Sequence, residues 1–100
     1  MLRTVEFSKN DMAYGMKIGL KLQEYSVMSY LNYLGCKGDF VFACRKTACK
    51  QMPLISTKPD TFYRHYVRLE KLGLIKYRRE SDKITFTDAG CIWEGTCHSD

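Results

Sequence analysis

The sequence predicts a single, mostly helical α+β domain, and two patterns support this fold class. Apolar residues recur at the 3.6-residue spacing of a helix in residues 22–34 and again in residues 58–72. After Gly73 the spacing changes to the alternation of apolar and polar residues that is typical of β-strands. One hundred residues suffice for one modest core, so we expect residues 21–90 to form the core of a single domain over 1–100.

The first twenty residues are expected to form an N-terminal arm and helix ahead of that core. Residues 2–7 alternate loosely, which predicts a short strand or an extended arm. Residues 11–20 follow with an apolar stripe at helical spacing, which consists of Met12, Met16 and Leu20. Two glycines, Gly15 and Gly19, weaken this helix. The stripe fits either a contact with a second copy of the chain or packing on the chain's own core.

The clearest core helix covers residues 22–34, where Val27, Leu31 and Leu34 share one face, and Gly35 is expected to end it. A turn at 37–39 then leads to Phe-Val-Phe at 40–42, which predicts a short strand.

A shorter helix is predicted for residues 45–52, because Ala48 and Met52 fall on one side and the basic residues on the other. Pro53 is expected to stop it. Only a few residues separate this helix from the helix at 58–72. Two helices joined in this way, the second with a basic outer face, predict a helix-turn-helix.

The helix at 58–72 has both start and stop signals. Thr57 and Asp60 have the spacing of a capping box, Pro59 falls in the first turn, and Gly73 can end the helix. Its two faces differ in chemistry. The apolar arc comprises Phe62, Tyr66, Leu69 and Leu72, and the opposite arc comprises Thr61, Arg64, Arg68 and Lys71. His65 falls on the core-side arc, which predicts a packed neutral imidazole.

Residues 74–79 and 83–87 predict a β-hairpin joined by residues 80–82. A last helix is predicted after it, capped by Thr87 and followed by the tail at 91–100. The apolar face of that helix would contain Ala89, Ile92 and Trp93.

The whole chain has a net charge of +5, and its positive charge is concentrated in one segment. Residues 45–79 hold ten Lys or Arg against two acidic residues, a net charge of +8, whereas the rest holds six against nine. Such clustering favours a polyanionic partner. A basic face that only meets solvent fits the helix at 58–72 as well.

The order of elements resembles the winged helix-turn-helix superfamily, and two segments resemble it in sequence. Residues 61–75 read T-F-Y-R-x-Y-x-x-L-E-x-L-G-L-I, similar to the family's T-V-x-R-x-L-x-x-L-E-x-x-G-L-I. Residues 85–90, T-F-T-D-A-G, are similar to the segment after the wing. Within the superfamily, the chain is similar to compact phage or plasmid proteins and to MarR-like regulators. This resemblance implies a three-helix core with a two- to three-stranded β-wing. Ser56 departs from the family pattern, because it stands five residues before Thr61 rather than three.

The resemblance implies that Thr61 and Arg64 face the major groove of DNA. Arg68, one turn further along, is expected to meet phosphate, and Tyr63 fits either a core flank or a DNA contact. The hairpin's cations would flank the neighbouring minor groove, or protect a solvated sheet edge. The complete set of candidate DNA-binding residues is Arg45, Lys46, Thr57, Lys58, Thr61, Tyr63, Arg64, Arg68, Lys76, Arg78, Arg79 and Lys83.

These observations predict a sequence-specific double-stranded DNA-binding protein, a small transcriptional regulator that acts as a homodimer. The helix at 58–72 would enter the major groove and the wing at 76–84 would lie on the adjacent minor groove or backbone. Two alternatives use the same surface: a plasmid or phage replication-initiation or partition protein, and a winged module that binds protein only.

Other classes receive no support from the sequence. Neither histidine has a catalytic partner by motif, and no phosphate-binding glycine loop follows a strand, so we expect neither an enzyme nor a cofactor. The five cysteines are expected to be reduced, and a zinc site from Cys91, Cys97 and His98 with Cys44 or Cys49 matches no strong ligand spacing. With no signal peptide or membrane span, we expect a cytoplasmic, nucleoid-associated protein.

Overall fold

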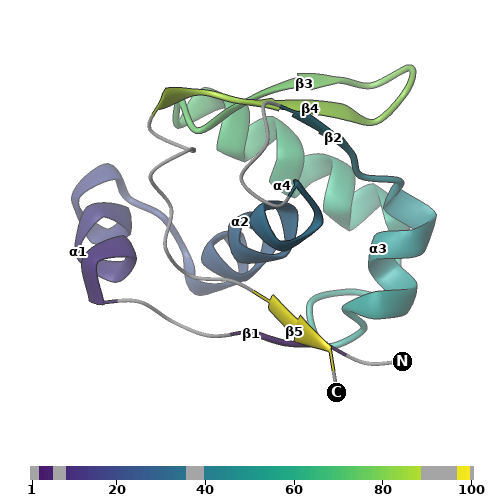
Figure 1. Cartoon of the computed structure of the whole chain (residues 1–100), viewed down its shortest axis with the longest axis horizontal. Helices are drawn as coiled ribbons and strands as arrows, with labels where there is room; N and C mark the ends of the chain where they lie inside the picture. The colour runs from purple at the N-terminus through teal and green to yellow at the C-terminus, as the bar shows by residue number, and fades with distance from the viewer. Residues whose placement is uncertain (1–2, 6–8, 36–39, 89–96, 100) are drawn as a thin grey trace.

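A three-stranded sheet, a helix beneath it and a buried central helix form the layers of the protein (Figure 1). The computed structural model describes residues 3–5, 9–35, 40–88 and 97–99. The elements with described bounds are β1 (Arg3–Val5), α1 (Lys9–Ile18), α2 (Leu22–Gly35), β2 (Phe40–Phe42), α3 (Arg45–Gln51), α4 (Pro59–Lys71), β3 (Ile75–Arg78), β4 (Lys83–Phe86) and β5 (Cys97–Ser99). The predicted α+β, mostly helical class is confirmed.

Two short strands, β1 and β5, form a small separate sheet at the bottom of Figure 1. β1 and β5 pair antiparallel, with Arg3 opposite Ser99 and Val5 opposite Cys97. A strand at the N-terminus was one of the two forms that the sequence allowed. Its partner was not expected, because three residues inside a polar tail give no strand signal of their own.

α1 ends earlier than predicted, and the reason lies at Gly19. This glycine has φ +82°, and the N–H groups of Gly19 and Leu20 bond to the carbonyls of Met16 and Gly15. These two hydrogen bonds form a Schellman motif, which requires a residue that tolerates positive φ without strain. Gly19 therefore terminates α1 instead of merely weakening it, and Leu20 lies beyond the helix.

α2 is the centre of the core, which explains why its sequence has no fully polar face. Val27, Met28 and Leu31 are completely buried, and Tyr30 is almost so. The buried Asn32 is satisfied within the helix, because its side-chain amide donates to the Met28 carbonyl at 3.1 Å. The predicted helix at 22–34 is confirmed and includes Gly35.

α3 and α4 form the predicted pair of helices, and α4 lies between the sheet and α2 (Figure 1). Phe62, Tyr66 and Leu69 of α4 are fully buried, as the apolar arc predicts. Gly73, at φ +83°, closes a second Schellman motif through the bonds from Gly73 and Leu74 to Glu70 and Leu69. The stop signal of α4 was therefore predicted correctly.

The predicted capping box at Thr57 and Asp60 is wrong. The N-cap of α4 is Lys58, which has no side-chain cap, and Thr57 is exposed. Pro59 takes the first helical position, where its missing N–H and fixed φ fit best, so the capping positions lie one residue later than the box requires. Ser56 supports this turn instead, because its hydroxyl accepts the Lys58 N–H at 3.0 Å.

The sheet has the order β2-β4-β3, with both pairs antiparallel. Val41 lies opposite Ile84, which lies opposite Tyr77. The strand at 40–42 and the hairpin are thus confirmed, although the hairpin strands are shorter than predicted. A helix, a strand, two helices and a hairpin whose second arm pairs with the first strand are compatible with a winged-helix layout. The predicted last helix, with Ala89, Ile92 and Trp93, lies outside the described residues.

Candidate nucleic-acid interface

The outer face of α4 carries exposed cations because its opposite face is buried. Phe62, Tyr66 and Leu69 fix the rotation of the helix in the core, which turns Arg64 and Lys71 into solvent. Arg64 has no ion-pair partner among the described residues. At the start of the helix, Thr57 and Lys58 are exposed too, whereas Thr61 is half-buried at the margin of this face.

Arg68, predicted to meet phosphate, is held by the protein itself. Its Nε lies 3.1 Å from Oε2 of Glu24, and its Nη2 donates to the Gly19 carbonyl at 3.4 Å. The Glu24 side chain is only 5% exposed, against 44% for Arg68. Its other oxygen accepts the Lys21 N–H at 2.8 Å, so the same carboxylate caps the start of α2. Arg68 therefore neutralises a buried charge first of all.

Sequence reasoning missed the role of Glu24. A Glu three residues after the helix N-cap is a capping signal in itself, and this signal was available in the sequence.

A recess lies between α2 and α4, beside this pair. Its volume is about 440 Å³, and its lining residues are Lys21, Gln23, Glu24, Arg64, His65 and Arg68. Three of these residues, Lys21, Arg64 and Arg68, are basic, and the Glu24 carboxylate among them is already paired with Arg68. The recess therefore extends the positive surface of α4 toward the start of α2.

His65 lies at the inner edge of the recess. Burial lowers the pKa of its imidazole below the ordinary value, and Glu24 and Lys21 act on it in opposite directions. Its Nε2 is buried with no hydrogen-bond partner, and its ring lies nearly perpendicular to that of Phe62, with centroids 6.4 Å apart. These contacts fit the predicted neutral imidazole.

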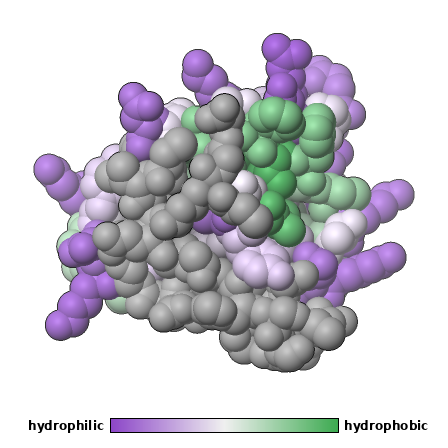
Figure 2. Space-filling model, viewed as in Figure 1, coloured by the Kyte–Doolittle hydropathy of each residue, from purple (hydrophilic) through white to green (hydrophobic). Residues whose placement is uncertain are grey.

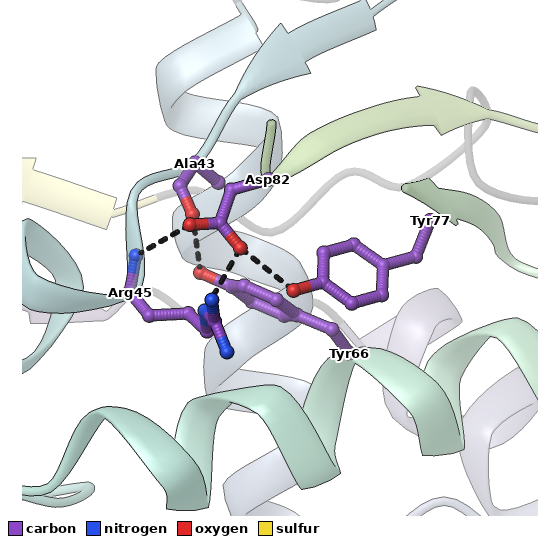
Figure 3. A network of polar contacts seen from close by, with 5 residues as sticks. All are labelled: Ala43, Arg45, Tyr66, Tyr77 and Asp82. Carbon is purple, nitrogen blue, oxygen red and sulfur yellow. Dashed lines mark hydrogen bonds and ion pairs between the residues drawn. The ribbon is translucent and has the colours of Figure 1, made fainter. Parts of the chain in front are cut away.

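On the other side of α4, the hairpin turn is locked to the start of α3 (Figure 3). Arg45 Nε lies 2.9 Å from Oδ1 of Asp82, and the same oxygen accepts the Tyr77 hydroxyl at 2.6 Å. The Asp82 backbone carbonyl accepts the Ala43 N–H at 2.9 Å. Asp82 sits at φ +53°, a conformation that Asp and Asn tolerate better than most residues. The network fixes the turn against α3.

The tyrosines of this network act as donors. Tyr66 donates its hydroxyl to the Ala43 carbonyl at 3.2 Å, as Figure 3 shows. Burial raises the pKa values of Tyr66 and Tyr77 well above their ordinary value, so both hydroxyls keep their protons.

Tyr63 joins α4 to the hairpin and carries two guanidinium groups on its ring. The Cζ atoms of Arg45 and Arg79 lie 5.7 and 5.0 Å from the ring centroid, within cation–π range. The ring also packs on Tyr77, with centroids 6.0 Å apart. Tyr63 is thus a flank of the core, and it holds the predicted Arg79 on the α4 side of the hairpin. Lys46, which follows Arg45 in α3, is exposed, as its predicted outward position requires.

The other predicted hairpin cations lie on the opposite side of the sheet. Tyr77 and Ile84 face α4 and the core, so by strand alternation Lys76, Arg78 and Lys83 face outward. The sequence grouped these three with Arg79, because a hairpin prediction without a known register does not separate its two faces.

The described residues contain no cluster of three or more potential metal ligands. The zinc hypothesis rests in part on Cys91 and on the side chains of Cys97 and His98, which lie outside the described residues. Cys49 donates its thiol to the Lys46 carbonyl. Cys44 is exposed at the N-cap of α3, where the Thr47 backbone N–H and hydroxyl lower the pKa of its thiol.

No described helix has the length and apolar character needed to cross a membrane.

A comparison of the chain with protein-family models, curated proteins and solved structures finds no match in any of the three.

Proposed function

We propose that the protein binds double-stranded DNA as a winged helix-turn-helix, with α4 in the major groove. The observation that carries the proposal is the outer face of α4, where Arg64 and Lys71 project opposite the buried Phe62, Tyr66 and Leu69. A helix of this kind fits the width of the major groove, and an exposed Arg can pair with a guanine edge. The layout of helices and sheet is compatible with this role.

The geometry also selects among the candidate contacts. Arg64 is the candidate for base recognition, because no described carboxylate competes for its guanidinium. Lys46 and Arg79 are candidates for phosphate contacts, since both are exposed and belong to elements that lie next to α4. Arg68 and Arg45 have structural roles, and Lys76, Arg78 and Lys83 face away from α4.

Homodimerisation is part of the proposal, because one module buries too little surface on DNA for tight binding. The N-terminal region offers a suitable contact. Met12, Met16 and Leu22 are exposed apolar side chains beside a groove of about 170 Å³. Two copies joined there would present two α4 helices to two half-sites. Sedimentation equilibrium tests this part. A monomer in the absence of DNA, together with one copy of the protein per duplex in its presence, would contradict homodimerisation.

The test is fluorescence anisotropy of a labelled random duplex, titrated with protein at several salt concentrations. Binding should weaken steeply with salt, because phosphate contacts release counterions. Arg64→Gln with Lys71→Gln should lower affinity about tenfold or more and make the binding less dependent on salt. The matched control is Lys76→Gln with Arg78→Gln, which removes the same charge from the far face of the sheet.

Two results would reject the proposal. The first is a wild-type protein that ignores duplex DNA at low salt, which would favour a protein-binding module. The second is an equal loss in both double variants, because non-specific charge would then explain the binding. If the proposal holds, site selection separates a regulator, which should prefer one palindrome, from a replication or partition protein, which should prefer direct repeats.

A further inference from the structure

The outer face of the three-stranded sheet combines exposed aromatic rings with cations. Phe40 and Phe42 of β2 are 48% and 61% exposed, and their rings meet edge to face with centroids 5.6 Å apart. In Figure 2 a hydrophobic area lies over the part of the sheet that contains β2 in Figure 1, and hydrophilic side chains project around it. Two large aromatic side chains left in solvent on a regular strand are informative, because the core does not need them there.

The strand register places the cations beside these rings. One row across the sheet runs Phe40, Thr85, Lys76, and the next row runs Phe42, Lys83, Arg78. Lys83 Nζ lies 4.6 Å from the centroid of the Phe40 ring. Neighbouring strands are about 4.8 Å apart, so the cations of β4 and β3 start about 5 and 10 Å from the aromatic strand. The six residues of these rows include three cations and no carboxylate.

We propose that this aromatic–cationic face binds single-stranded nucleic acid. Unpaired bases would stack on Phe40 and Phe42, while the adjacent phosphates would meet Lys76, Arg78 and Lys83. A duplex is a poorer partner, because its base faces are already stacked on one another and are not open to the rings. This face lies on the side of the sheet that points away from α4. The proposal for it does not depend on duplex binding by α4.

The same charges disfavour a second copy of the chain as the occupant. A two-fold symmetric contact through this face would bring the three cations of each copy against the three cations of the other. A single strand offers both complements at once, a flat apolar ring and a negative charge in every nucleotide. An acidic protein segment would satisfy the cations but would leave the rings with no flat partner.

The experiment measures binding of a labelled oligo-dT of about 12 nucleotides by anisotropy at several salt concentrations, within the range of site sizes seen for single-strand binders. Phe40→Thr with Phe42→Thr should weaken binding tenfold or more, and Thr is chosen because it keeps strand propensity. Lys76→Gln with Arg78→Gln should weaken binding and lower the salt slope. Arg64→Gln with Lys71→Gln is the matched control and should leave oligo-dT binding within about threefold of wild type.

A second readout tests stacking directly. In Phe42→Trp the new indole should retain binding, and its fluorescence should be quenched by oligo-dT and not by poly-L-glutamate. The wild type, with its own tryptophan, gives the background.

Four outcomes would overturn the inference. They are no binding of oligo-dT at low salt, a loss confined to the charge variants, equal competition by poly-L-glutamate, and a dimer in sedimentation that Phe40→Thr with Phe42→Thr abolishes. The first two would remove base stacking, the third would assign the face to an acidic protein, and the fourth to a second copy. None of them changes the expectation for duplex DNA on α4, since the Arg64 and Lys71 variant reports on that surface separately.

Discussion

The two flanks of α4 each contain an arginine–carboxylate ion pair, but the two pairs differ in burial and in role. Each flank holds an arginine that sequence reasoning assigned to DNA, and each arginine is paired with a carboxylate of the protein. On the α2 flank, Arg68 meets Glu24, which is nearly buried. On the α3 flank, Arg45 meets Asp82, which is more exposed at 14% and shares its oxygens with Tyr77. The pair on the α2 flank neutralises a buried charge, whereas the pair on the α3 flank fixes a surface turn.

This difference teaches how to divide a basic surface into structural and functional cations. An arginine whose removal leaves a carboxylate in the core is constrained by stability, whatever else it contacts. Arg64 lies between the two flanks on the same helix and carries no such constraint. We therefore expect mutations on α4 to separate into those that unfold the protein and those that only change its binding.

The largest effect is expected for Arg68→Ala. Among the described residues it leaves the buried Glu24 carboxylate with the Lys21 N–H as its remaining partner, which should lower the free energy of unfolding by about 2–3 kcal/mol. The measurement is urea unfolding followed by circular dichroism. Adding Glu24→Gln to Arg68→Ala should recover part of the loss, because a neutral amide oxygen can still accept the Lys21 N–H. A single variant as stable as the wild type would show that the pair has no structural role.

A smaller loss is expected for Asp82→Asn on the α3 flank. Asparagine tolerates the positive φ of this position and can accept the Tyr77 hydroxyl, so mainly the ion pair with Arg45 is lost. We expect a loss of about 1 kcal/mol in the same unfolding experiment. Glu80→Gln, at an exposed position of the same turn, is the matched control and should be neutral. A loss as large as that of Arg68→Ala would contradict the contrast between the flanks.

The fold was largely predictable because its signals are local. Phe62, Tyr66 and Leu69 recur at helical spacing, and Gly73 marks the end of α4, so pattern and structure agree. The capping box failed because Thr57 is one residue early, and the proline at 59 decides where the helix begins. The pairing of β1 with β5 could not be predicted, because contacts between distant short segments leave no periodic signal.

The candidate site was less predictable than the fold. Charge and helical phase placed Arg64 correctly in solvent, yet the same reasoning could not see that Glu24, distant in sequence, would hold Arg68. Likewise, the register needed to separate Arg78 from Arg79 depends on how β4 pairs with β2 and β3. Partners from other elements decide which cations are available, and they become visible only in three dimensions.

Each flank also contains a titratable probe, and Cys44 reports on the α3 flank. The Thr47 backbone N–H and hydroxyl lower the pKa of its thiol, so its thiolate should form at a lower pH than that of an ordinary cysteine. Alkylation by iodoacetamide from pH 6 to 9, followed by peptide mass mapping, should give Cys44 a rate profile shifted to lower pH. Thr47→Ala should move the profile back toward that of a free thiol. An unshifted profile in the wild type would show that the start of α3 does not stabilise the thiolate.

His65 reports on the α2 flank, where the smallest effect is expected. Burial lowers the pKa of its imidazole in the folded protein, so below about pH 6.5 the unfolded chain binds this proton more readily than the folded one. The contribution of His65 to stability is therefore complete above about pH 6.5 and declines as the pH falls below that value. Urea midpoints for the wild type and His65→Gln between pH 5 and 8 should converge on acidification. Parallel profiles would mean that the imidazole titrates equally in both states, and that burial beside Phe62 does not hold it neutral.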